Sequence, residues 1–249
     1  MKLSPKKSYV QVALNSTIEE SLKVVAMLPA DERIIYEIGT PMIKEFGMSA
    51  VREVRAALSQ KALGAAMTGV KIQPSKGLKG FFEQMSTGVS KNTPYIVADM
   101  KTIDRAEREI AIAKSAGADG VVMMGTAPIE TLRKGLEVGK EMEVDIFIDM
   151  MNVDFPLSIL RELGETPKGV YLHRGVDETE ATKKQLPMHE IRRILGEKDV
   201  MIGVAGGDTP REIQSAIFND ADVVVIWKAV YQADKGAKEL VEEVLKNLN

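Results

Sequence analysis

The chain has 249 residues, with 45% hydrophobic and 28% charged residues, a formal net charge of −3 and no cysteine. The lack of cysteine excludes disulfides, cysteine zinc sites and thiol nucleophiles. The sequence has no block of basic residues, so we expect no nucleic-acid partner. The start, MKLSPKKSYVQVALN, has an apolar run too short for a signal peptide or a membrane span. We therefore expect a cytoplasmic protein with no membrane partner.

Short apolar runs rich in Val and Ile alternate along the chain with longer segments in which apolar residues recur at helical spacing. Helices are predicted at about 49–58, 105–116, 129–142 and 236–248. Eight strands are predicted: Tyr9–Leu14, Ile34–Ile38, Tyr95–Ala98, Gly120–Met124, Asp145–Ile148, Gly169–Leu172, Val200–Val204 and Val223–Ile226.

The alternation of strands and helices predicts βαβ units and a parallel sheet. Several runs are almost continuously apolar, as strands covered by helices are. Eight units in about 250 residues predict an α/β fold, a single-domain (β/α)8 TIM barrel. A doubly wound open sheet is the alternative, but no glycine-rich fingerprint follows the first strand.

The segment 59–93 interrupts this rhythm before the third strand. It is rich in Gly, Lys and Ser and is much longer than the few residues that such a connection needs. We interpret it as an inserted surface loop with a short helix or as an oligomer contact. A lid over the active site is disfavoured because the segment enters at the N-terminal side of the barrel.

Polar residues stand at the ends of most of the predicted strands, where a barrel places its active site. A single Asp there is often only a helix cap or turn residue, but many polar groups around one rim indicate function. They include Asn15, Glu37, Asp99, Lys101, Asp149, His173, Arg174 and Lys228.

The stretch YIVADMKTID, residues 95–104, is the most informative of these strand ends. Asp99 and Lys101 are two residues apart and should point the same way, whereas Asp104 lies on the following loop. A lysine between carboxylates stays charged, which suits it to stabilise an anion. Glu37 and Asp99 could share a divalent cation such as Mg²⁺, or they could belong to an ion-pair network without metal.

The ends of the last two strands indicate a phosphate site. Gly206 and Gly207 would expose backbone N–H groups, and Lys228 would add positive charge.

The chain resembles the orotidine 5'-phosphate decarboxylase superfamily. Within it, the chain is most similar to the group of 3-hexulose-6-phosphate synthase and 3-keto-L-gulonate-6-phosphate decarboxylase. The resemblance covers most of the chain outside the insertion. The motifs that carry it occur in order: YEIGTPMIKEFG, ADMKTID, AGADGVVMMG, DMMNV, LHRGVDE and GVAGGDTP.

The resemblance implies a homodimeric barrel with Mg²⁺ held by Glu37 and Asp99. Lys101 would lie beside the reacting oxygens, Asp104 would reach the partner's site, and His173 would transfer protons. Gly206, Gly207 and the end of strand eight would bind the substrate phosphate. The residues after His173 favour the synthase, because Val176 stands where the decarboxylase tends to have an arginine. The implied reaction is a reversible condensation of formaldehyde with ribulose 5-phosphate through an enediolate.

Two substrate-contacting positions depart from the family pattern. The first strand ends in Ala-Leu-Asn15 where these families have Ala-Leu-Asp, and the eighth ends in Trp227-Lys228 where they have Gly-Arg or Gly-Gly. Asn15 can still hydrogen-bond a sugar hydroxyl, whereas the bulk of Trp227 would reshape the phosphate pocket. The alternatives are therefore a decarboxylase or other lyase acting on a different sugar phosphate, and a non-catalytic binding or regulatory homologue.

Overall fold

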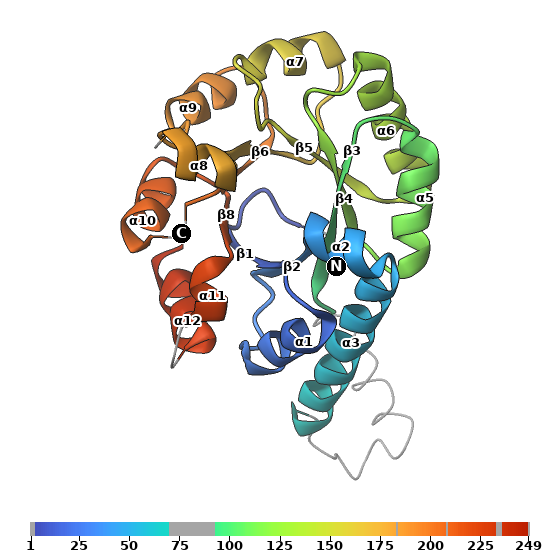
Figure 1. Cartoon of the computed structure of the whole chain (residues 1–249), viewed down its shortest axis with the longest axis vertical. Coiled ribbons are helices and arrows are strands. Elements are labelled where there is room, and N and C mark those ends of the chain that lie inside the picture. Colours follow the sequence, from blue (N-terminus) through green and yellow to red (C-terminus); the bar gives the residue numbers. More distant parts are fainter. Residues whose placement is uncertain (1–2, 70–92, 183, 208, 233–235, 249) are drawn as a thin grey trace, which may run out of the picture.

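The computed structural model describes residues 3–69, 93–182, 184–207, 209–232 and 236–248. Its strands form a closed parallel barrel in chain order, β1 to β8, with helices around the outside (Figure 1). This confirms the TIM barrel and rules out the open sheet. The strands are β1 Tyr9–Leu14, β2 Ile34–Ile38, β3 Tyr95–Thr102, β4 Gly120–Met124, β5 Asp145–Asp149, β6 Gly169–His173, β7 Met201–Ala205 and β8 Val223–Ile226.

The barrel is closed by pairing between β1 and β8, with Val12 opposite Ile226. The described helices are α1 Ile18–Met27, α2 Thr40–Phe46, α3 Ser49–Gly69, α5 Ala106–Ala116, α6 Ile129–Met142, α7 Pro156–Leu163, α8 Val176–Thr182, α9 His189–Leu195, α10 Pro210–Phe218, α11 Lys228–Gln232 and α12 Ala237–Asn247. Within these described parts of the chain, no helix is both long and apolar enough to cross a membrane.

Two apolar layers explain why the strands look continuously hydrophobic in sequence. Val10, Val12 and Leu14 face outward and pack under the helices. The alternate positions of β1 face inward, where Tyr9 and Ala13 join a separate cluster inside the barrel. Because side chains alternate with period two, the inward row of each strand passes from this inner cluster to the residues at the rim.

Helix α3 extends eleven residues beyond the predicted end at Leu58 and takes up the first part of the predicted insertion. Val51, Val54, Leu58 and Ala62 are buried at helical spacing, which continues the apolar stripe past Leu58. Residues 59–69 are therefore helix rather than loop. The rest of the predicted insertion, up to residue 92, lies outside the described residues.

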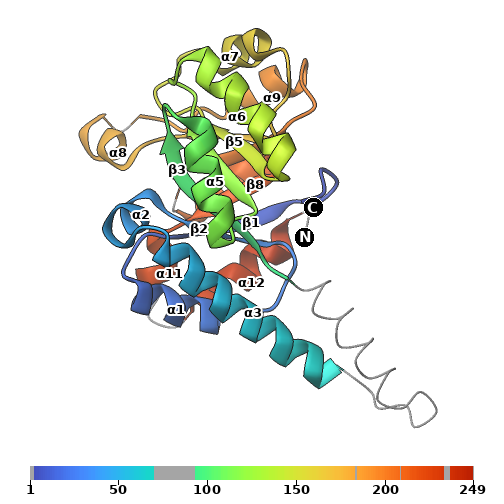
Figure 2. The same ribbon diagram turned by 90° about the vertical axis from the view of Figure 1, so that its right-hand side faces the viewer.

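Helices α2 and α8 project at the same end of the barrel, seen on the left of Figure 2. Both begin within three residues of the strand they follow, so this is the end to which the strands point. At the opposite end, Leu3 joins the inner cluster and accepts a hydrogen bond from Lys168 through its carbonyl. The strand-end residues thus share one rim.

Candidate active site

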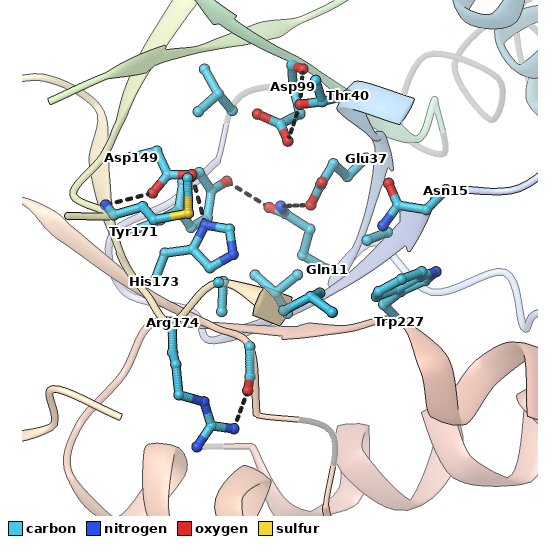
Figure 3. Close-up of a pocket in the computed structure, with 18 of the residues that line it drawn as sticks. Gln11, Asn15, Glu37, Thr40, Asp99, Asp149, Tyr171, His173, Arg174 and Trp227 are labelled. Carbon is cyan, nitrogen blue, oxygen red and sulfur yellow. Dashed lines mark hydrogen bonds and ion pairs between the residues drawn. The ribbon is translucent and has the colours of Figure 1, made fainter. Parts of the chain in front are cut away.

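A cavity of about 410 Å³ opens at the C-terminal rim of the barrel. This volume is in the usual range of small-molecule sites. Most of the predicted site residues line it: Asn15, Glu37, Asp99, Lys101, Asp149, His173, Arg174, Gly206, Trp227 and Lys228. Figure 3 shows side chains from opposite sides of the barrel converging on this space.

Lys101 lies between two buried carboxylates. Its Nζ is 2.9 Å from Asp99 Oδ2 and 2.9 Å from Asp149 Oδ2. Burial lowers the pKa of this amine, but the charges of Asp99 and Asp149 and their hydrogen bonds outweigh it and raise the pKa above its usual value. Lys101 is therefore a permanently charged ammonium held in one place.

The backbone at Lys101 is unusual. Its φ is +46°, and the pairing of β3 with β4 shifts register between Ala98 and Thr102. A bulge of this kind re-aims side chains, and the left-handed conformation costs roughly 1–2 kcal/mol for a residue with a Cβ. The two ion pairs of the ammonium offset this strain. The expectation that Asp99 and Lys101 point the same way holds, although a bulge rather than plain strand alternation brings it about.

Asp149 connects the lysine to the histidine. Its Oδ2 is 2.7 Å from His173 Nδ1 as well as 2.9 Å from Lys101 Nζ, and its Oδ1 accepts from the N–H of Met151. Burial alone would raise the pKa of Asp149, but His173 and Lys101 lower it to about 2. An ionised carboxylate only accepts hydrogen bonds, so His173 donates to it from Nδ1. Its Nε2 is then left to exchange a proton with a ligand.

The imidazole of His173 projects toward the centre of the cavity (Figure 3). Burial lowers its pKa, but the charge of Asp149 and its hydrogen bond raise it above the usual value. A histidine tuned in this way can both accept and return a proton near neutral pH.

Glu37 and Asp99 project from adjacent strands. Asp99 Oδ2 accepts from the hydroxyl of Thr40 at 2.8 Å, and Glu37 Oε2 accepts from Gln11 Nε2 at 2.5 Å. Burial, and next the charge of Asp99, raise the pKa of Glu37 to about 7. A hard divalent cation bound between these two buried carboxylates would offset both the cost of burying their charges and their mutual repulsion.

Glu37 and Asp99 therefore fit Mg²⁺ in their donor chemistry. Among the residues that the structure describes, no group of three or more His, Asp or Glu side chains is placed to hold a metal ion. Further ligands would have to be substrate oxygens and water, which is a common way for proteins to bind Mg²⁺.

The far side of the cavity carries the predicted phosphate residues. Gly206 lines it with φ +87°, but Gly207 is buried behind Leu186 and Glu212 and is not among the lining residues. Lys228 Nζ lies 3.8 Å from a carboxylate oxygen of Glu180 on α8. Of the two predicted glycines, only Gly206 is thus placed to meet a ligand.

The guanidinium of Arg174 points away from His173 (Figure 3). It donates to the carbonyl oxygens of Gly206 and Lys184 and pairs with Glu212 at 2.8 Å. Glu212 also closes the capping box of α10 with Thr209. Arg174 therefore braces the loop after β7 as well as lining the cavity.

The two departures from the family pattern lie on the same side of the cavity. Figure 3 shows Asn15 and Trp227 near each other, at the ends of β1 and β8. Trp227 is half-buried and packs against the inner cluster. The indole is thus part of the cavity wall.

Asp104 does not reach this cavity. It is exposed on the loop after β3 and lines a separate surface depression with Arg105 and Arg108. A single chain therefore does not bring it to the other site residues, and its predicted role in a partner's site stays a prediction.

Gln11, Thr40 and Tyr171 also line the cavity, although they were not among the predicted site residues. Gln11 could have been found, because it is the one polar residue in the strand YVQVAL and a buried amide needs partners. Tyr171 gives no such signal, since a tyrosine in a buried strand is commonly a core residue.

Known proteins with similar sequences indicate the family of this chain. Residues 69–242 match the family described as Orotidine 5'-phosphate decarboxylase / HUMPS family. The bifunctional enzyme Fae/Hps of Methanospirillum hungatei is 30% identical over 242 residues, which is 97% of this chain and 53% of that protein. The chain thus spans about half the length of the curated relatives it matches.

Solved structures show the same fold. A crystal structure of 3-hexulose-6-phosphate synthase superposes with a TM-score of 0.74 at 25% identity, covering 96% of this chain and 99% of that one. The 3-hexulose-6-phosphate synthase from Salmonella typhimurium gives a TM-score of 0.74 at 21% identity, covering 96% and 98%. With its rim residues in place and the match spanning most of its length, this chain belongs to the orotidine 5'-phosphate decarboxylase / HUMPS family.

Proposed function

We propose that the chain is a magnesium-dependent aldehyde-lyase that condenses formaldehyde with ribulose 5-phosphate, reversibly. The observation that carries this proposal is the contiguous set Asp99, Lys101, Asp149 and His173, in which a fixed cation lies beside a proton-transfer group. Relatives named as Fae/Hps enzymes and a structure named 3-hexulose-6-phosphate synthase support it.

The reaction needs a carbanion equivalent. His173 removes a proton from the carbon next to the ketone of ribulose 5-phosphate, which gives an enediolate. Lys101, already oriented by Asp99 and Asp149, stabilises the negative charge as it develops on the oxygens. The enediolate carbon then attacks the carbonyl carbon of formaldehyde, and the resulting alkoxide takes a proton from the imidazolium.

Glu37 and Asp99 would hold Mg²⁺, which when bound supplies additional positive charge for the oxygens of the substrate. Gly206 and Lys228 would bind the phosphate, whose binding energy acts at a distance from the reacting carbons.

The direct test is formaldehyde consumption by the purified chain. Formaldehyde should disappear only when ribulose 5-phosphate and Mg²⁺ are both present, and EDTA should stop the reaction. Consumption that does not require the sugar phosphate, or no consumption by a folded protein that binds Mg²⁺, would count against the proposal.

The proposed Mg²⁺ site predicts that Mg²⁺ stabilises the fold in a pH-dependent way. The folded-state pKa of Glu37, about 7, lies above the ordinary value of 4.5. This carboxyl therefore lowers the free energy of unfolding progressively as pH rises from about 4.5 to 7. Mg²⁺ binds the ionised form, so it should raise Tm more at pH 8 than at pH 5.5.

Thermal melts with and without Mg²⁺ measure this effect, with two matched variants. Glu37→Gln should lose most of the Mg²⁺-dependent shift. Glu190→Gln changes a buried glutamate on α9 that is outside the cavity, and it should keep the shift. Equal Mg²⁺ shifts in the wild type and in Glu37→Gln would rule out Glu37 as a ligand.

We also propose a cytoplasmic homodimer in which Asp104 completes the partner's site. The exposure of Asp104 and its absence from its own cavity support this arrangement. Asp104→Ala and Lys101→Ala should each be inactive alone. A refolded equal mixture should recover about a quarter of wild-type activity, because half of the dimers are mixed and each has one intact site. A mixture as inactive as its components would show that Asp104 does not act across subunits.

A further inference from the structure

Gln11 is a buried amide at the floor of the cavity, in the middle of β1. It is 1% exposed, and both ends of its side chain are hydrogen-bonded. Nε2 donates to Glu37 Oε2 at 2.5 Å, and Oε1 accepts from the hydroxyl of Tyr171 at 2.6 Å. Tyr171, Gln11 and Glu37 thus form a continuous chain of hydrogen bonds, which we call the cross-barrel bridge.

The bridge fixes which way the amide faces. In its ionised form, which is the form that binds a cation, the Glu37 carboxylate accepts and cannot donate, so it requires the NH₂ group of Gln11. The Tyr171 hydroxyl donates to the oxygen at the other end. A reversed amide would set its oxygen against the ionised carboxylate, so Glu37 selects the orientation of Gln11 and the hydroxyl of Tyr171 adds a hydrogen bond to it.

The fold makes room for this bridge. Tyr171 lies on β6 and Gln11 on β1, which are not neighbours in the closed barrel, so the phenol reaches across the interior. Its ring stacks on Phe147 with centroids 5.5 Å apart and covers Gly203 on β7. A Cβ at Gly203 would lie 2.3 Å from Tyr171 Cδ1, so any residue other than glycine would clash with the ring in this position.

We propose that Tyr171 and Gln11 are positioning residues that hold the Glu37 carboxylate for a divalent cation. The hydrogen bond from Gln11 engages Oε2, which turns Oε1 to the ligand. The inference rests on the proposed function, because it takes Glu37 as a cation ligand. Partners of this kind orient metal-binding side chains, and their loss typically lowers metal affinity by about 10- to 100-fold.

The test measures Mn²⁺ binding to the substrate-free protein by electron paramagnetic resonance, with Mg²⁺ competition. Gln11→Met keeps the length of the side chain and removes both hydrogen bonds, and it should weaken Mn²⁺ binding about 10- to 100-fold. Tyr171→Phe keeps the ring in its packing and should weaken binding about 3- to 10-fold, the equivalent of one hydrogen bond. Because Tyr171 acts through Gln11, the double variant should bind like Gln11→Met alone.

Tyr95→Phe is the matched control. Tyr95 is also a buried tyrosine of the inner cluster, but its hydroxyl donates to Asp145 and does not line the cavity. Its loss should lower stability and leave Mn²⁺ affinity unchanged, which separates positioning from general damage to the core. Should Gln11→Met fail to fold, Tyr171→Phe decides alone.

The outcomes separate this inference from the proposed function. Wild-type Mn²⁺ affinity in both variants, or additive losses in the double variant, would overturn the bridge and leave the aldolase proposal standing. Bridge-dependent Mn²⁺ binding in a protein that consumes no formaldehyde would support the bridge and count against the aldolase. A wild type that binds no Mn²⁺ would overturn the bridge together with the metal part of the proposed function.

Discussion

Replacing Lys101 with alanine is expected to lower kcat by at least about 10³-fold. Removing one preorganised charge-stabilising group from an active site costs about 10²–10³, and here the ammonium also organises Asp99 and Asp149, each 2.9 Å away. Without it, these two buried carboxylates lose their shared counter-charge. The variant should therefore also be less stable, by roughly 3 kcal/mol.

Steady-state kinetics and urea denaturation measure the two effects separately. Lys61→Ala is the matched control, because Lys61 donates to the carbonyl oxygens of Val25 and Leu28 and lies away from the cavity. It should lose stability and keep kcat. A Lys101→Ala protein that retains more than a tenth of wild-type kcat would show that the lysine is structural.

Asp149→Asn is expected to lower kcat by about 10²–10⁴, the range of a general acid–base contribution. The neutral amide cannot hold a charge beside Nδ1, so the pKa of His173 should fall back from its raised value. The acidic limb of the pH–rate profile should therefore move to lower pH in the variant, as measured from its residual activity. A limb at the wild-type position would show that His173 is not the titrating base.

The same substitution tests the linkage of Asp149 to stability. Its folded-state pKa, about 2, lies below the ordinary value of 3.8. The group therefore stabilises the fold by about 2 kcal/mol at neutral pH, and this is lost as pH falls from about 4 toward 2. The difference in unfolding free energy between wild type and Asp149→Asn should shrink by most of that amount between roughly pH 6 and pH 2.5. A difference that does not change with pH would contradict the assigned ionisation.

The barrel itself could be predicted because two signals agree along the chain outside residues 59–93. Strand length and apolar content mark each strand, and the helical spacing between them fixes the parallel arrangement. The rim residues follow from this fold, since polar side chains such as Asp149 and His173 stand where apolar runs stop. The predicted end of the third strand is wrong: β3 runs on to Thr102 instead of stopping at Ala98, because its last residues pair again after the bulge.

The remaining features depend on backbone geometry and on tertiary contacts that the sequence does not signal. The left-handed backbone at Lys101 has no sequence signal, because lysine does not favour that conformation. The bridge from Tyr171 to Glu37 crosses the barrel, and neither residue type reveals its partner. The burial of Gly207 depends on the loop at Leu186 and on Glu212, which local turn chemistry does not specify.

The most direct measurement of the central claim is the fate of ¹³C-labelled formaldehyde followed by NMR. With ribulose 5-phosphate and Mg²⁺, the wild type should move the labelled carbon into a new carbon–carbon bond of a six-carbon ketose phosphate, and Lys101→Ala should not. A folded wild-type protein that binds Mg²⁺ but leaves all of the label in formaldehyde would contradict the assignment of this site as an aldolase.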